Sequence, residues 1–209
     1  MKNRTRVIGA LAAAATVSTL VASGITGAPA AADNRRGFSF TMVRAQGAEA
    51  ADCLRDAHAS VRIYPKRFNE VMTIRAEGLP PDTNFDLFIL QLPNFPFGVS
   101  WYQSDMRSNR YGVAWITVVG RFNVETFSLA PAPGPAPTPH PEDDDATNPA
   151  FGPIHMHHVG FWFNSPEEAV AAGCPGAQTP FNGDHTAGVQ AMSTRNYPDL
   201  EGPLGQLVP

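Results

Sequence analysis

Alternation of apolar and polar residues dominates this chain and predicts β-strands. The clearest example runs from Ala57 to Tyr64, where every second side chain is apolar, as in a strand with one face against a core. The segments with strand patterns are 38–42, 57–64, 72–77, 85–92, 101–105, 112–119, 121–129, 154–163 and 189–193. About nine strands joined by short turns predict an all-β fold, an antiparallel β-sandwich.

Two of these segments carry extra information. Residues 85–92 are apolar at nearly every position, which predicts a central strand covered on both faces. Asp86 interrupts that run, and we expect a hydrogen-bonded structural carboxylate there. Residues 101–105 and 112–119 are expected to form the two arms of a hairpin, with Ser108-Asn109-Arg110 near its tip.

One short helix is expected after the strand 154–163. Ser165-Pro166-Glu167-Glu168 has an N-cap residue, a proline at the first helical position and a glutamate at the third, which is the capping-box pattern. Gly173 ends the helix, directly before Cys174.

The composition changes between residues 130 and 153. These 24 residues hold eight of the 20 prolines, and then the acidic run 142–145. Strand patterns flank the stretch on both sides, so we interpret residues 33–209 as one domain with a Pro/Asp-rich inserted loop. The acidic run lacks the ligand spacing of a calcium loop, which favours a solvated segment over a calcium site.

Residues 1–30 have the pattern of a secretory signal peptide. Lys2, Arg4 and Arg6 precede an apolar, Ala-rich run that ends at small-residue cleavage sites near Ala30. Retention of the run as a membrane anchor is the alternative. We expect a secreted or cell-surface protein with no membrane span after cleavage.

Charge limits the classes of partner. Cleavage after residue 30 would remove three of the 15 basic residues and none of the 19 acidic ones, moving the net charge from −4 to −7. Nucleic acid and anionic membranes require clustered positive charge, so the sequence argues against both. The ligand, the partner and the oligomeric state are beyond what the sequence indicates.

Cys53 and Cys174 are the two cysteines of the chain. An even pair in an exported protein predicts one disulfide, which would join the start of the domain to its end. A thiol pair for metal or redox work is the alternative, although no CxxC motif supports it.

Histidines supply the strongest indication of chemistry. Ile154-His155-Met156-His157-His158 contains an HxH pair, which on a strand places two imidazoles on the same side. With His185, or the neighbouring Asp184, this pair could bind zinc or copper. The alternative is a set of ordinary histidines bonded within the fold.

Aromatic residues concentrate in the segment 94–102. Phe95, Phe97, Trp101 and Tyr102 could form a platform for a sugar ring or an apolar ligand at one end of the sandwich. The same residues could instead close the end of the core.

The search for catalytic motifs finds no candidate catalytic residue. Ser100 lacks the second glycine of a nucleophile elbow, and the HExxH, Walker and strand-linked GxGxxG patterns are absent. Asp86, Asp105 and Glu125 are scattered along the chain, and nothing in the sequence pairs them as acid and base.

Several short motifs resemble known proteins. The segment 77–87, Glu-Gly-Leu-Pro-Pro-Asp-Thr-Asn-Phe-Asp-Leu, resembles the turn into a strand found in Ig-like and fibronectin-like sandwiches. With Ser-Trp-Tyr-Gln at 100–103, Phe-Asn-Ser-Pro at 163–166 and Gly-Cys-Pro at 173–175, residues 53–207 resemble a group of uncharacterised secreted bacterial proteins. This resemblance implies export and an Ig-like β-sandwich, and it brings no known activity and no catalytic residues.

Two functional hypotheses follow. The first is an exported, non-enzymatic β-sandwich protein that binds something at the cell surface or in the medium. The second is a histidine-ligated zinc or copper protein, an enzyme in one version, centred on His155, His157 and His185.

Overall fold

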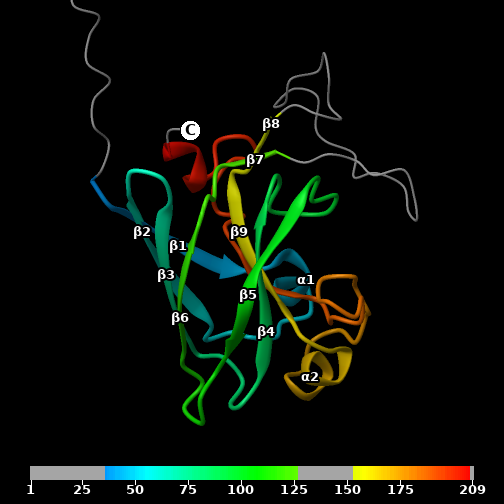
Figure 1. Ribbon diagram of the computed structural model, residues 1–209. Coiled ribbons are helices and arrows are strands. Elements are labelled where there is room, and N and C mark those ends of the chain that lie inside the picture. The colour runs from blue at the N-terminus through cyan, green and yellow to red at the C-terminus, as the bar shows by residue number, and fades with distance from the viewer. Residues whose placement is uncertain (1–35, 127–152, 208–209) are drawn as a thin grey trace, which may run out of the picture. The chain divides into compact units, whose positions relative to one another are not determined.

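An eight-stranded antiparallel sheet makes up most of the protein (Figure 1). The structure is a computed structural model, and it describes residues 36–126 and 153–207. The strands are β1 (Phe38–Arg44), β2 (His58–Pro65), β3 (Glu70–Glu77), β4 (Asn84–Leu90), β5 (Ser100–Arg107), β6 (Ala114–Gly120), β7 (Val124–Thr126), β8 (Pro153–His155), β9 (His158–Phe163) and β10 (Gln190–Ser193). The helices are α1 (Gln46–Ala50) and α2 (Pro166–Ala171), with a 3₁₀ turn at Pro203–Gln206. The all-β class is therefore confirmed.

The strands of the large sheet follow the order β5-β4-β9-β10-β1-β2-β3-β6, and β7 pairs with β8 separately. The two edge strands, β5 and β6, also contact each other, so the sheet nearly closes on itself. Every pairing is antiparallel. Because the sheet curves until its two edges meet, the apolar faces of all eight strands point into one enclosed interior.

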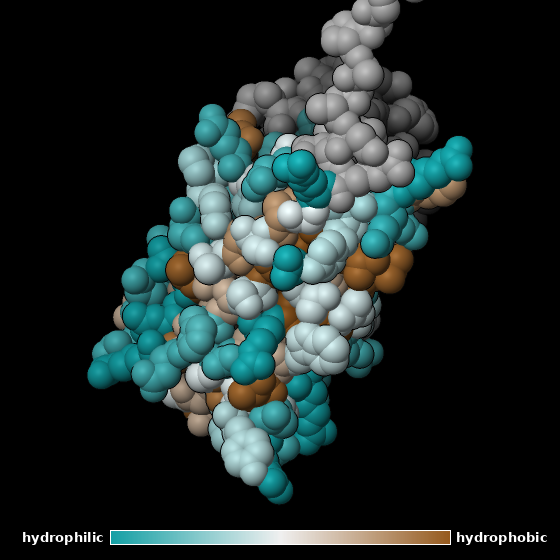
Figure 2. Space-filling view, turned by 90° about the vertical axis from the view of Figure 1, so that its left-hand side faces the viewer, coloured by the Kyte–Doolittle hydropathy of each residue, from teal (hydrophilic) through white to brown (hydrophobic). Residues whose placement is uncertain are grey.

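The core fills that interior. From β1, β2 and β3 it receives every second side chain, because each of these strands exposes its other face. Val61, Ile63, Met72 and Ile74 are fully buried. The outward face of β2, β3 and β6 is mainly hydrophilic, with separate apolar residues among the polar ones (Figure 2). The predicted alternation in these segments is confirmed.

The predicted hairpin between residues 101–105 and 112–119 is wrong in its pairing. The turn exists, since the Asn109 amide donates to the Val113 carbonyl at 2.9 Å and Ser108 bridges to Ala114. Beyond the turn, however, β5 pairs with β4 and β6 pairs with β3. The two arms therefore lie at opposite ends of the strand order, and the turn between them connects the two edge strands of the sheet.

The segment 154–163 is two strands instead of one. The Met156 amide donates to the Asn123 carbonyl at 2.8 Å, and the His157 amide donates to the Leu90 carbonyl at 3.0 Å. The chain therefore leaves its pairing with β7 and joins β4 within two residues. This change of partner raises the number of described strands to ten.

Helix α2 begins as the sequence predicts. The Ser165 hydroxyl accepts a hydrogen bond from the Glu168 amide at 3.2 Å, and Pro166 occupies the first turn. The reciprocal half of the capping box is replaced by a tertiary contact. The Glu168 carboxylate accepts from the backbone and side-chain amides of Asn84, at 3.0 and 2.8 Å. Helix α2 is thereby attached to the start of β4. The five-residue helix α1 was not predicted.

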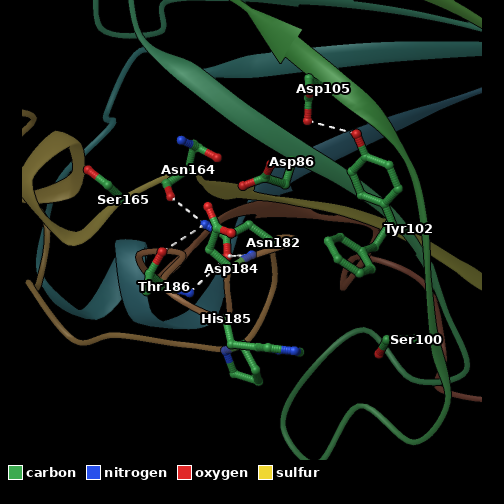
Figure 3. Close-up of a pocket in the computed structure, with 13 residues that line it drawn as sticks. Asp86, Ser100, Tyr102, Asp105, Asn164, Ser165, Asn182, Asp184, His185 and Thr186 are labelled. Carbon is green, nitrogen blue, oxygen red and sulfur yellow. Dashed lines mark hydrogen bonds between the residues drawn. The ribbon is translucent and has the colours of Figure 1, made fainter.

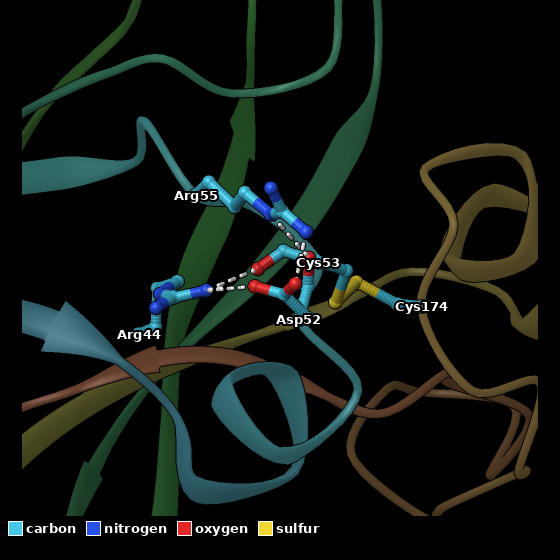
Figure 4. The surroundings of a disulfide bond; sticks show 5 residues. All are labelled: Arg44, Asp52, Cys53, Arg55 and Cys174. Carbon is cyan, nitrogen blue, oxygen red and sulfur yellow. Dashed lines mark hydrogen bonds and ion pairs between the residues drawn. A yellow bond between two sulfur atoms is a disulfide. The ribbon is translucent and has the colours of Figure 1, made fainter.

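The disulfide predicted between Cys53 and Cys174 is confirmed, across 121 positions (Figure 4). Cys53 follows α1 and Cys174 follows α2, so the bond links the ends of the two helices. Arg44 donates to the Cys53 carbonyl at 3.0 Å, and Asp52 lies between Arg44 and Arg55.

Two expectations for this chain concern residues outside the described part. The signal peptide at 1–30 lies there, and so does almost all of the inserted loop at 130–153. Within the described residues, no helix has both the length and the apolar character needed to cross a membrane.

Candidate functional site

Strands β4 and β9 are buried on both faces, because a second cluster of side chains, separate from the main core, covers their outward faces. Their outward side chains form a second apolar cluster of Phe88, Leu90 and Trp162, against which Phe97 and Phe181 pack. The rings of Trp162 and Phe181 are stacked, with centroids 3.9 Å apart and planes at 5°. This small cluster lies beneath two loops and forms the floor of the candidate site.

The two covering loops are held by their own hydrogen bonds. In the loop between β4 and β5, the Leu92 amide donates to the Phe97 carbonyl at 2.9 Å. In the loop before β10, the Thr179 amide donates to the Ala187 carbonyl at 2.7 Å, and the Gly188 amide donates to Phe163 at 2.8 Å. The first loop is therefore closed by its own hydrogen bond, and the second is also attached to β9 through Gly188.

Between β4, β5 and the second loop lies a polar pocket of about 690 Å³ (Figure 3). That volume is within the range of small-molecule sites. Its lining residues are Asp86, Phe88, Ser100, Tyr102, Asp105, Asn164, Ser165, Pro180, Asn182, Gly183, Asp184, His185 and Thr186. Three of them are aspartates, and none is a lysine or an arginine.

Asp86 and Asp105 are directly opposite each other in the β4–β5 register, so their side chains share the pocket face. Asp86 is 2% exposed. Burial, followed by the Asp105 charge and a hydrogen bond with Asp105, raises the pKa of Asp86 from 3.8 to about 7. Because of this, Asp86 holds its proton through the mildly acidic range and bonds to Asp105 as a neutral acid.

Tyr102 completes this group because of an irregularity in β5. Two residues of β4, Leu87 and Phe88, face Ser104 and Tyr102, so Gln103 is an extra residue in β5. The bulge turns Tyr102 to the same face as Asp105, three positions away. The Tyr102 hydroxyl donates to Asp105 at 2.7 Å. Burial and this hydrogen bond raise the pKa of Tyr102 to about 12, so the phenol stays protonated.

The opposite wall of the pocket is built from asparagines. With its amide nitrogen toward Asp86, Asn164 lies 3.2 and 3.3 Å from the two carboxyl oxygens. Asn182 donates to the Asn164 carbonyl at 2.9 Å and accepts from the amides of Asp184 and Thr186, at 3.1 and 2.8 Å. Asn182 thus shapes the turn that brings Asp184 and His185 to the pocket.

A second, more apolar pocket of about 500 Å³ adjoins the polar one. Ser100 and Pro180 line both pockets. The apolar pocket is lined by Phe95, Pro96, Phe97, Gly98, Ser100, Gln178, Thr179, Pro180 and Phe181. We call the two together the cleft.

The structure divides the predicted aromatic loop. Phe97 packs against Trp162 and Phe181, as in the core interpretation. Phe95 is 84% exposed and lines the apolar pocket, as the ligand interpretation requires. Tyr102 lines the polar pocket, whereas Trp101 lines neither half of the cleft.

The predicted histidine set is not brought together. His155 and His157 line a separate pocket of about 200 Å³, and His185 lines the cleft. Among the described residues, no group of three or more histidine, cysteine, aspartate or glutamate side chains is placed to hold a metal ion. The reason is the break after β8, which directs His155 and His157 to another part of the molecule.

Sequence reasoning missed the main feature of the cleft, the pairing of Asp86 with Asp105. One signal was present, a carboxylate inside an otherwise apolar strand. Its partner was not recognisable, since the two residues meet through strand register over 19 positions. Asn164 belongs to the Phe-Asn-Ser-Pro motif at 163–166, but nothing in that motif indicates a contact with Asp86.

Comparison with known proteins adds no family assignment: no protein-family model matches the chain, and no curated protein matches it.

Proposed function

We propose that this chain is an exported, non-enzymatic β-sandwich protein of the Ig-like type that binds a small ligand in the cleft. The ligand carries a flat apolar ring and, beside it, hydroxyl or amino groups. The observation that carries the proposal is the meeting of an aromatic surface and a cluster of carboxyl groups at Ser100 and Pro180.

The aromatic half of the cleft is suited to binding the flat ring of the ligand. Phe95 projects beside Phe97 and Phe181, with centroids of Phe95 and Phe97 6.1 Å apart and those of Phe97 and Phe181 5.3 Å apart. Phe97 and Phe181 are held by Trp162 underneath, so the surface is pre-formed. Preorganised aromatic surfaces bind rings without paying a large ordering entropy.

The polar half of the cleft is suited to binding the hydrogen-bond donors of the ligand. Asp105 and Asp184 present carboxylate oxygens, and Asp86 changes from donor to acceptor as it ionises near pH 7. Hydroxyl and amino groups donate to such oxygens, and an amine also gains from their negative charge.

Export is supported by two features of the chain. The N-terminal pattern is that of a signal peptide, and the long-range disulfide belongs to the kind that persists in oxidising compartments. The eight strands form one continuous sheet, and its two halves, β1–β2–β3–β6 and β10–β9–β4–β5, enclose one shared core, as the two layers of a sandwich do.

The test is binding of ring-bearing probes, namely 2-phenylethylamine, 2-phenylethanol and methyl glycosides, followed by isotope-edited NMR of the mature chain. We expect shifts at Phe95, Phe181 and Asp184, and loss of binding in Phe95→Ala. Trp115→Ala is the matched control, because Trp115 is 70% exposed on the outer face of β6. The proposal fails if no probe shifts the cleft resonances, or if Trp115→Ala weakens binding as much as Phe95→Ala.

A further inference from the structure

The turn between β2 and β3 lies at one end of the sheet and carries positive charge beside exposed aromatic rings (Figure 1). The turn is Lys66-Arg67-Phe68-Asn69, and the Lys66 amide closes it by donating to the Asn69 carbonyl at 2.7 Å. Arg62 and Tyr64 lie on the outward face of β2, shortly before the turn. We call this surface the basic tip, and its residues are Arg36, Arg62, Tyr64, Lys66, Arg67 and Phe68.

The cations and rings of the basic tip contact one another. The Arg62 guanidinium carbon lies 5.0 Å from the centroid of the Tyr64 ring, and the Lys66 ammonium nitrogen lies 5.9 Å from the same centroid. At the turn, the Arg67 guanidinium carbon is 4.9 Å from the centroid of the Phe68 ring. Each ring of the tip is therefore bordered by positive charge, in the geometry of cation–π contacts.

The segment that leads into β1 adds a fourth cation. The Tyr64 ring lies against Gly37, where an added Cβ atom would be 2.7 Å from the Tyr64 Cδ1 atom. Arg36 directly precedes Gly37 and is exposed. The four cations thus come from two separate segments of the chain, which the pairing of β1 with β2 brings to the same end of the sheet.

The positive charge of the basic tip is not neutralised within the described residues. None of its four cations forms an ion pair with a described carboxylate. The acidic residue closest to the turn in sequence, Glu70, is 4% exposed and lies 3.5 Å from Arg121. Clustered cations of this kind attract a partner that supplies negative charge.

The position of Phe68 indicates the class of that partner. Phe68 is 74% exposed at the turn, and no residue of the basic tip lines the cleft or the pocket at His157. In a lipid bilayer, such a ring enters the boundary between headgroups and acyl chains while neighbouring cations stay at the headgroups. A soluble polyanion would neutralise the cations but would leave the ring in water, so the exposed ring favours the bilayer.

We propose that the basic tip binds the surface of an anionic lipid bilayer, with Phe68 at the boundary of the acyl chains and the four cations against the headgroups. The net charge of the chain argues against such a partner, but net charge averages over surfaces that the fold separates. The carboxyl groups of the cleft lie on β4 and β5, and three strands separate β4 from β2 in the sheet order. The proposal is independent of the ligand in the cleft.

The test is cosedimentation of the mature chain with vesicles of phosphatidylglycerol and phosphatidylcholine in equal parts, compared with vesicles of phosphatidylcholine alone. We expect binding to the anionic vesicles that weakens as salt is added, and no binding to the neutral vesicles. Equal binding to both kinds of vesicle, or binding to neither, overturns the proposal.

Variants of the turn separate the contribution of charge from that of the ring. The Lys66→Ala, Arg67→Ala double variant should weaken binding to the anionic vesicles by about 30-fold, at about fivefold for each cation removed. Phe68→Ala should weaken it by about tenfold, because the bilayer no longer buries the ring. Unchanged binding in either variant overturns the proposal.

Arg110 and Tyr111 provide a matched control at the opposite end of β3 and β6. The Arg110 guanidinium carbon lies 4.6 Å from the centroid of the Tyr111 ring, and Tyr111 is 71% exposed, so the contact resembles that of Arg67 with Phe68. Arg110→Ala and Tyr111→Ala should leave binding unchanged. Losses equal to those at the turn overturn the assignment to the basic tip. Circular dichroism establishes that each variant is folded before its binding is compared.

Insertion of the ring distinguishes a bilayer from a soluble polyanion. In Phe68→Trp, anionic vesicles that contain brominated lipid should quench the added fluorescence, whereas the fluorescence added in Tyr111→Trp should not change. Binding of the chain to heparin without quenching in Phe68→Trp would show that the tip recognises a polyanion through charge alone, and it would overturn the proposal.

Discussion

At the scale of single residues, Asp86 shows how position changes the chemistry of a carboxyl group. It lies among buried apolar side chains of β4 and opposite a second carboxyl group. Burial and the Asp105 charge both disfavour ionisation and outweigh the Asn164 amide, whose donation to the same oxygens favours the ionised form. The result is an acid whose protonation changes near neutral pH, at the point where a ligand would contact it.

The raised pKa predicts the direction of a pH effect on stability. In the unfolded chain Asp86 loses its proton near pH 3.8, whereas in the folded protein it keeps the proton until about pH 7. The folded state binds more protons between these values, so the free energy of unfolding should fall as the pH rises from about 4 to 7. The slope from this one group is about 1.4 kcal/mol per pH unit.

Asp86→Asn should remove this dependence, since an amide retains the donor of the neutral acid and never ionises. Urea denaturation should find the variant more stable than wild type at pH 8, by on the order of 2–4 kcal/mol, and less so at pH 5. Asp56→Asn, at an exposed position, is the control. Parallel stability–pH curves for Asp86→Asn and wild type would contradict the assignment.

At the scale of elements, the cleft depends on how α2 and β5 are attached to β4. Glu168 attaches the first turn of α2 to Asn84, the first residue of β4. The bulge in β5 brings Tyr102 and Asp105 to one face. The backbone ladder with β4 also holds β5, and the Cys53–Cys174 disulfide and buried Ala169 also hold α2.

The adjacent glutamates of α2 provide a matched test of that attachment. Glu168→Ala removes the acceptor for two donors of Asn84 and should reduce the free energy of unfolding by about 1–3 kcal/mol. Glu167→Ala should lower the urea midpoint less than Glu168→Ala does, because Glu167 is exposed and its side chain interacts with Ser165 and with its own backbone at the start of the helix. Equal midpoints for the two variants would show that the Asn84 contact contributes little.

At the scale of the whole molecule, the disulfide joins segments that no strand pairing connects directly. Cys53 and Cys174 are both buried and are separated by 121 positions. A cross-link over so long a loop restricts the unfolded chain strongly, which raises the relative stability of the folded state.

The Cys53→Ala, Cys174→Ala double variant should lose about 2–5 kcal/mol of unfolding free energy in urea. Wild-type protein under reducing conditions should show a similar loss, and the reductant should not change the double variant. If reduction does not shift the wild-type midpoint, the disulfide does not contribute the stabilisation argued above.

The sequence by itself determined the features that depend on neighbouring residues. The strand pattern of β2 follows from its period-two alternation, and the start of α2 follows from Ser165 and Pro166. The disulfide followed from composition, because two cysteines allow a single pairing. In each case the information lies within a few positions, or in a count, and no knowledge of distant contacts is needed.

Only the tertiary structure decided which edges pair and which side chains meet. The two arms of the expected hairpin do not pair with each other. Strand β5 pairs with β4 and strand β6 pairs with β3, so each arm is hydrogen-bonded by a different strand of the sheet. Asp86 meets Asp105 through strand register, and His155 is separated from His185 by the change of partner at Met156. These contacts depend on how edges far apart in sequence satisfy their hydrogen bonds, which local periodicity does not encode.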